Sequence, residues 1–179
     1  PPLALDRLPP LDEAQKAGQN AESIFKFRFS AMANELLSLG IDFNCAPVLD
    51  IARATTHRFL RNRCYGVNKS DVIALGRVAY DALKSNGIFP IIKHMPGHGL
   101  ASHDSHFELP VVKASKKELL ANDFAVFRAF CDAEIAMSAH VLFDAIDPHS
   151  AASTSKKLMG IIRNDIKFSG LLISDDISM

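Results

Sequence analysis

Apolar and polar positions along the chain predict helices and strands that follow one another in turn. Apolar residues recur at helical spacing in four stretches, which we predict as helices: residues 21–38, 71–86, 115–132 and 156–163. The first of these should end at Gly40, and the second should be capped by Ser70 and end before Gly87. Ser115 and Glu118 form a capping box at the start of the third helix.

Between these helices lie short apolar runs that we predict as strands: residues 41–49, 88–92, 134–137 and 171–173. Near-continuous apolar strands are typical of sheets that are buried on both faces. Strands that alternate with helices predict parallel β/α units, because parallel strands need crossover connections. The pattern alone does not distinguish a closed barrel from an open α/β sheet, although no glycine-rich dinucleotide fingerprint follows any strand.

Polar side chains follow each predicted strand: Asp50; Lys93 and His94; Ser138 and His140; Ser174, Asp175 and Asp176. In both parallel architectures, function gathers at the carboxyl ends of the strands. Neighbouring residues of a strand point to opposite faces, so we expect only one of Asp175 and Asp176 to face the site. This edge of the sheet is the expected position of an active site.

Composition excludes several classes of protein. A length of 179 residues with 48% hydrophobic side chains fits one globular domain, residues 1–179. The formal net charge of zero gives no electrostatic support for a nucleic-acid or membrane partner, and no apolar stretch is long enough to cross a bilayer. Three widely spaced cysteines, Cys45, Cys64 and Cys131, favour a reducing cytoplasm over a disulfide framework.

The loop after residues 88–92 is rich in histidine, so a metal site is one hypothesis. Its histidines are His94, His98, His103 and His106. Zinc sites need three or four converging ligands, usually at fixed helical or hairpin spacing. Pro96, Gly97 and Gly99 argue against a helix here, so His94 and His98 cannot be assumed to share a face. We therefore predict no metal.

The triplet Asp104-Ser105-His106 suggests acid–base chemistry instead. A carboxylate two residues from an imidazole can bind one ring nitrogen, fix the tautomer and favour the protonated ring. Such a histidine can serve as a general acid near neutral pH. Ser105 is not expected to be a nucleophile, because three adjacent residues cannot easily form a converging triad and no G-x-S-x-G elbow exists.

Several blocks together resemble the β-N-acetylglucosaminidase (β-hexosaminidase) branch of glycoside hydrolase family 3. Residues 93–99 and 104–106 are similar to the KHFPGHG…DSH pattern of that branch, with Met95 in place of phenylalanine. The other similar blocks are residues 43–50, 61–66, 137–141 and 161–179. The resemblance implies a (β/α)8 TIM-type barrel, of which this chain holds about four central β/α units. The first two strands and the last ones of the family's N-terminal catalytic barrel are absent, so we expect an incomplete domain.

The resemblance also implies a retaining exo-β-N-acetylglucosaminidase that forms a covalent glycosyl-aspartate. Asp175 would be the nucleophile. His106 would be the general acid and then the general base, oriented by Asp104. Residues that hold the sugar hydroxyls in the family correspond to Arg63, Lys93 and His94. No cofactor is implied.

For partners, the resemblance implies N-acetylglucosamine-containing muropeptides from cell-wall recycling in the cytoplasm, and we expect a monomer that binds neither nucleic acid nor membranes. Other hypotheses stay open. A family 3 β-glucosidase or xylosidase would use a glutamate elsewhere as its acid, and a phosphorylase would exploit a histidine that repels phosphate less than a carboxylate does. Outside the enzymes, an inactive sugar-binding relative or a metal-binding module would fit.

Overall fold

The four predicted strands form a single parallel sheet in a computed structural model that describes residues 8–101 and 109–176. The strand order is β1-β2-β4-β6. The strands are β1 (Phe43–Asn44), β2 (Phe89–Met95), β4 (Ile135–Ser138) and β6 (Leu171–Ser174). Each pairs with its neighbour in parallel, so the chain crosses over between strands through helices, as the alternating pattern predicts.

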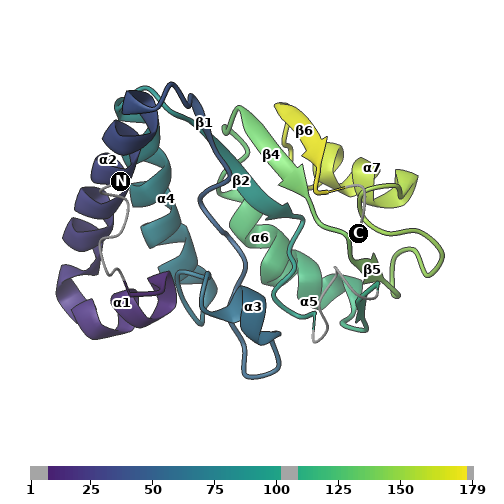
Figure 1. The fold of residues 1–179 in the computed structure, drawn as a ribbon. Coiled ribbons are helices and arrows are strands. Elements are labelled where there is room, and N and C mark those ends of the chain that lie inside the picture. The colour runs from purple at the N-terminus through teal and green to yellow at the C-terminus, as the bar shows by residue number, and fades with distance from the viewer. Residues whose placement is uncertain (1–7, 102–108, 177–179) are drawn as a thin grey trace.

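The helices lie along the sheet in chain order, from the β1 end to the β6 end (Figure 1). α2 and α4 pack together beside β1 and β2, whereas α7 stands beside β6. A second, two-stranded parallel sheet that the pattern did not predict joins β3 (Val111–Val112) to β5 (Leu142–Phe143). The helical elements are α1 (Pro10–Ala17), the 3-10 helix η1 (Gly18–Asn20), α2 (Ala21–Ser38), α3 (Arg58–Arg61), α4 (Lys69–Ser85), α5 (Lys116–Ala121), α6 (Asp123–Arg128) and α7 (Lys156–Asn164).

The first strand is shorter than residues 41–49, which was the prediction. The Ala46 N–H turns back to the Asn44 carbonyl at 2.8 Å, and Pro47 has no N–H to donate, so the ladder is interrupted after β1. The chain returns to the sheet at Val48, which bridges Lys93. This irregular stretch carries the chain to Asp50 at the carboxyl edge of the sheet.

Two predicted helix features are also corrected. The cap of α4 is Asn68 rather than Ser70, because the Asn68 side chain accepts the Asp71 N–H at 3.0 Å. The helix expected over residues 115–132 begins as predicted, with Ser115 accepting the Glu118 N–H, but it breaks at Asn122 into α5 and α6. The break leaves Asp123 buried at the start of α6.

Side chains alternate across the sheet and divide the apolar residues between two faces. One face packs against the helices in a large core that includes Ile92, Ala136 and Phe127. The other face carries a smaller cluster of Ile91, Ile135 and Met137, with Ile173 packed against it. Within the described ranges, no helix is both long and apolar enough to cross a lipid bilayer.

Candidate active site

The candidate site residues lie beyond the smaller cluster on the same face of the sheet, because residues two apart in a strand share a face. Lys93 follows Ile91 on that face, and Asp175 follows Ile173. The register aligns the strand ends, with Met95 opposite Ser138 and Ser138 opposite Ser174. Lys93 and Asp175 are thereby brought to one edge of the sheet, although 82 positions separate them in the chain.

Lys93 is buried, with 8% of its surface exposed. Burial lowers the pKa of Lys93, the nearby charge of Arg63 lowers it further, and Asp175 and Asp50 oppose the shift. Among residues 8–101 and 109–176, no carboxylate lies within ion-pair distance of the Lys93 ammonium. A buried ammonium without such a partner favours a bound ligand that offers hydrogen-bond acceptors.

Asp50 is fully buried and accepts hydrogen bonds at both carboxylate oxygens. Oδ2 accepts from Nδ1 of His94 at 2.7 Å and from the His94 backbone N–H at 3.3 Å, and Oδ1 accepts the His98 backbone N–H at 2.6 Å. Burial by itself would raise the pKa of Asp50, but its interactions with His94 and His98, hydrogen bonds to both among them, hold that pKa below its usual value. Asp50 is therefore a buried, ionised acceptor.

His94 lies between two carboxylates. While Nδ1 contacts Asp50, Nε2 lies 3.7 Å from Oδ2 of Asp175, and only 5% of the residue is exposed. The Asp175 carboxylate is partly buried, and its Oδ1 accepts the Asp176 backbone N–H at 2.9 Å. Asp176 itself is exposed. Of the two adjacent aspartates, Asp175 is the one turned toward the buried histidine.

The loop that follows β2 packs closely on the chain after Asp50. A side chain at Gly99 would overlap the Ile51 backbone oxygen, and one at Gly97, which has φ +144°, would meet Asp123. Beneath this loop the Arg53 guanidinium binds the Asp123 carboxylate through two hydrogen bonds of 2.9 and 2.8 Å. Burial raises the pKa of Asp123 and the Arg53 charge opposes that rise. The pair ties α6 to the segment that follows Asp50.

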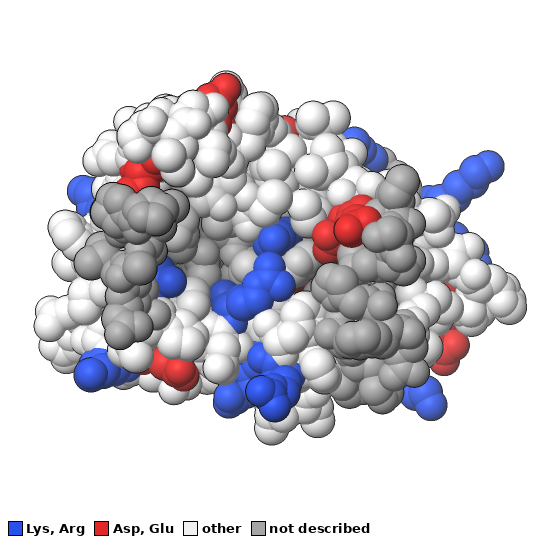
Figure 2. Space-filling view, in the orientation of Figure 1, with Lys and Arg blue, Asp and Glu red and all other residues white. Residues whose placement is uncertain are grey.

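On the face shown in Figure 2, Lys and Arg side chains gather near the centre and below it, and Asp and Glu side chains lie around them on several sides. Both signs of charge thus occur on this face. Such a mixture suits a polar ligand recognised by hydrogen bonds, whereas nucleic-acid sites present broad basic surfaces.

Comparison with known proteins identifies this arrangement. The model of the glycosyl hydrolase family 3 N-terminal domain matches residues 9–179. The chain belongs to glycoside hydrolase family 3. A β-hexosaminidase of Methylococcus capsulatus is 35% identical over 97% of the chain and 52% of its own length, and one of Vibrio cholerae is 32% identical with the same coverage.

Solved structures of family 3 members are similar in fold. NagZ from Neisseria gonorrhoeae in complex with N-trifluoroacetyl-D-glucosamine has a TM-score of 0.89 at 31% identity, and the match covers 99% of this chain and 54% of that one. A β-N-acetylglucosaminidase from a Paenibacillus strain has a TM-score of 0.86 at 29% identity, covering 95% and 32%. The predicted fold class is confirmed: the family 3 domain is a TIM-barrel-like α/β fold, and the chain forms part of one. The chain spans about half the length of the curated relatives it matches.

The structure brings together some of the predicted site residues and leaves others outside its description. Lys93, His94 and Asp175 lie at one edge of the sheet, and Arg63 lies close enough to Lys93 for its charge to lower that residue's pKa. Asp104 and His106, the predicted acid–base pair, lie outside the described residues. Within the described ranges, no three His, Cys, Asp or Glu residues are placed to hold a metal ion.

Sequence reasoning gave no role to three residues that the structure places at the site. Asp50 was noted only as a polar strand end. His98 is buried against His94, with ring centroids 5.5 Å apart. His140 binds Ser153 Oγ through Nδ1 at 2.6 Å and the Asp176 carbonyl through Nε2 at 3.0 Å, which fixes the chain next to Asp175. Their positions depend on contacts between distant segments, so no local pattern identified them.

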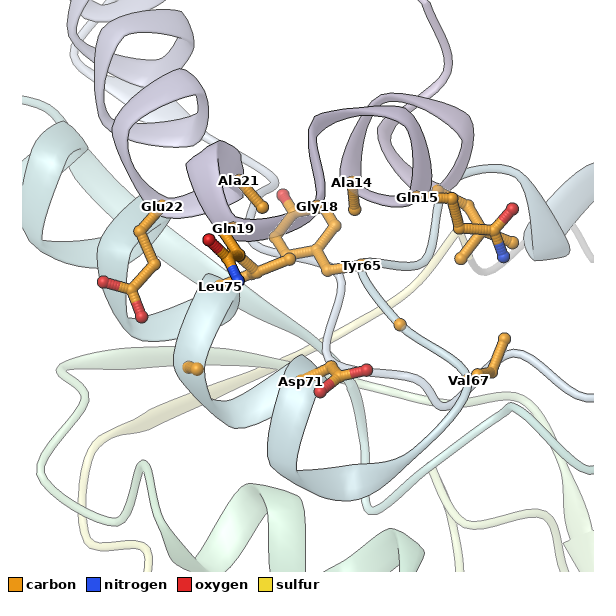
Figure 3. Close-up of a pocket in the computed structure, with 13 residues that line it drawn as sticks. Ala14, Gln15, Gly18, Gln19, Ala21, Glu22, Tyr65, Val67, Asp71 and Leu75 are labelled. Carbon is orange, nitrogen blue, oxygen red and sulfur yellow. The ribbon is translucent and has the colours of Figure 1, made fainter.

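A cavity of about 430 Å³ lies elsewhere, between the α1–α2 junction and the start of α4 (Figure 3). Apolar residues and the Tyr65 ring form much of its wall, and the carboxylates of Glu22 and Asp71 stand at its rim. None of the site residues that the structure describes lines it. The cavity offers no nucleophile and base in contact, so we assign the chemistry to the sheet edge.

Proposed function

We propose that the protein to which this chain belongs is a retaining exo-β-N-acetylglucosaminidase, with Asp175 as its nucleophile. The observation that carries the proposal is the position of the Asp175 carboxylate, at the carboxyl end of β6 and 3.7 Å from His94 Nε2, in a chain that resembles β-hexosaminidases over nearly its full length. Function in such folds gathers at this edge.

In the first step, an Asp175 oxygen attacks the anomeric carbon while the bond from that carbon to the leaving oxygen breaks. His106 gives its proton to the leaving group, and a glycosyl-aspartate forms. In the second step, water attacks the same carbon while the bond from that carbon to Asp175 breaks, and His106 takes the water proton. The free sugar leaves, and the Asp175 carboxylate is restored. Asp104 orients His106 through this exchange, and Arg63, Lys93 and His94 hold the sugar hydroxyls.

Muropeptide fragments that end in β-linked N-acetylglucosamine are the proposed substrates, and the cytoplasm is the proposed compartment. The support is the similarity to β-hexosaminidases and to NagZ, together with a buried Lys93 that lacks a carboxylate partner among the described residues. Hydroxyls and an amide of a neutral sugar satisfy such groups without adding buried charge. Hydrolysis whose rate is independent of added phosphate would distinguish a hydrolase from a phosphorylase.

The nucleophile is tested in the complete protein with an aryl β-N-acetylglucosaminide. We expect Asp175→Ala to reduce kcat by about four orders of magnitude or more, because removal of a catalytic nucleophile eliminates the covalent route. The matched control is Asp176→Asn, since this adjacent carboxylate is exposed and should change kcat less than about threefold, as ordinary surface substitutions do. Equal losses in the two variants would contradict the assignment of Asp175.

The acid–base role of His106 is tested by varying the leaving group. His106→Ala should slow turnover of a poor leaving group by about 10²–10⁴-fold, which is the usual contribution of general acid catalysis. An activated aryl leaving group needs no proton, so its release should be much less affected. If both kinds of substrate lost activity equally, His106 would not be the acid.

A further inference from the structure

Asp50 and His94 form a buried pair next to Asp175. The proposed reaction assigns no role to Asp50. Asp50 has no exposed surface; Oδ2 accepts from His94 in β2, and Oδ1 accepts from His98 in the loop after β2. Burial of a carboxylate costs free energy that only specific partners offset. Its position next to a ring that faces Asp175 suggests more than a structural role.

The contacts of Asp50 determine which nitrogen of His94 carries a proton. An ionised carboxylate is only an acceptor, and its pKa is held below the usual value here, so Nδ1 at 2.7 Å must be the donor. In the neutral ring, Nε2 then has a lone pair. This is the nitrogen that faces Oδ2 of Asp175 at 3.7 Å.

The surroundings prevent the ring from turning away. Oδ2 of Asp50 also accepts the His94 backbone N–H at 3.3 Å, so backbone and ring are held by one oxygen. On the other side, the His98 ring packs against His94, and burial lowers the pKa of His98 to about 4, which keeps this neighbour uncharged near neutral pH. The His98 backbone N–H binds the second Asp50 oxygen, which fixes the carboxylate itself.

We propose that Asp50 is a positioning residue that acts through His94: it holds the ring proton on Nδ1, so that Nε2 presents a lone pair rather than an N–H to the region beside Asp175. This rests on the proposed function, in which Asp175 is the nucleophile. An N–H at Nε2 would bind the Asp175 carboxylate, and a carboxylate that already accepts a hydrogen bond is a weaker nucleophile. A lone pair at Nε2 leaves Oδ2 of Asp175 without a hydrogen bond from His94 and accepts instead from a hydroxyl or amide N–H of the sugar.

Asp50→Asn tests the proposal, because an amide has one acceptor end and one donor end. With its NH₂ toward His94, the proton would move from Nδ1 to Nε2. In the complete protein, the nitrogen-15 shifts of the His94 ring are followed through a pH titration, with His94→Gln used for assignment. In the neutral form of the unmodified protein we expect a protonated Nδ1 and an unprotonated Nε2, and in Asp50→Asn the reverse.

With an aryl β-N-acetylglucosaminide, kcat of Asp50→Asn should fall about 10- to 100-fold, the usual range for residues that orient another functional group. We expect KM to rise as well, because a protonated Nε2 can no longer accept a hydrogen bond from the sugar. Asp123→Asn is the matched control: it alters a second buried carboxylate under the same loop, at 2% exposure, without contact to His94. It should lower the unfolding temperature and leave the nitrogen shifts of His94 unchanged.

A proton on Nε2 of the neutral His94 ring in the unmodified protein would overturn the proposal. This measurement needs no variant, so it still decides the question if Asp50→Asn fails to fold. A kcat for Asp50→Asn no lower than that of Asp123→Asn would overturn it as well. An unmodified protein with no activity on the glycoside would contradict the proposed function instead, whereas the nitrogen shifts would still report whether Asp50 controls the ring.

Discussion

His98 is an imidazole enclosed in the protein, with 3% of its surface exposed. Within the described part of the chain, neither ring nitrogen has a hydrogen-bond partner, and an aromatic ring from Phe59 meets it edge-on. Charging such a ring is unfavourable, and burial lowers its pKa to about 4. The sequence marked His98 as one of several loop histidines, but its environment makes it a neutral packing residue.

The low pKa of His98 predicts a loss of stability in acid. The folded-state pKa lies below the unfolded value of 6.5, so the unfolded chain binds the proton first as the pH falls. The stabilisation is complete above pH 6.5 and disappears progressively toward pH 4, by roughly 3 kcal/mol for a shift of this size.

Thermal unfolding of the complete protein between pH 7 and pH 4 measures this effect. His98→Phe keeps a planar ring and cannot titrate, so its unfolding temperature should fall less over this range than that of the unmodified protein. The other histidines are present in both proteins and cancel in the comparison. If the unfolding temperatures of His98→Phe and of the unmodified protein fell equally between pH 7 and pH 4, His98 would not titrate in this range.

At the level of elements, the turn after β2 depends on close approach to the segment that follows Asp50. Gly99 has no room for a side chain, because a Cβ would overlap the Ile51 carbonyl oxygen and lie 3.1 Å from Arg53 Nη1. Backbone atoms on the opposing segment cannot move aside as a flexible side chain can. The glycine is thus a packing requirement between two loops that each carry site residues.

Two glycine-to-alanine variants test this requirement. Gly99→Ala should destabilise the protein by about 1–3 kcal/mol, as overpacking of a tight contact does. Gly160 lies within α7, where an added Cβ would meet no atom within 4 Å, so Gly160→Ala should stabilise by about 0.5–1 kcal/mol through helix propensity. Urea unfolding of both variants measures the difference, and equal effects would mean that the two loops separate freely.

Several element boundaries followed from local chemistry, and the rest depended on distant contacts. Ser115 was predicted to begin a helix and does, because its hydroxyl accepts an N–H three residues ahead. The break at Asn122 was not predicted, since it accompanies the pairing of Asp123 with Arg53, 70 positions away. Hydrophobic spacing continues through the break and gives no sign of it.

Across the whole molecule, both outer strands of the four-stranded sheet leave apolar surface uncovered. Phe43 of β1 stacks on Phe89 of β2, and these side chains are 52% and 47% exposed, while Leu171 of β6 is 60% exposed. Open edges of a parallel sheet favour pairing with further strands. Because the curated relatives are about twice as long, we infer that further strands of the same barrel cover these edges in the complete protein.

The sequence by itself determined the order and type of the four β/α units, the edge where polar residues gather, and the family. These follow from local spacing and from short motifs, which are properties of neighbouring residues. Only the tertiary structure placed His94 between Asp50 and Asp175, with His98 enclosed beside it. Asp50 precedes His94 by 44 positions, so their contact depends on the register of the strands, which is set by packing over the whole sheet.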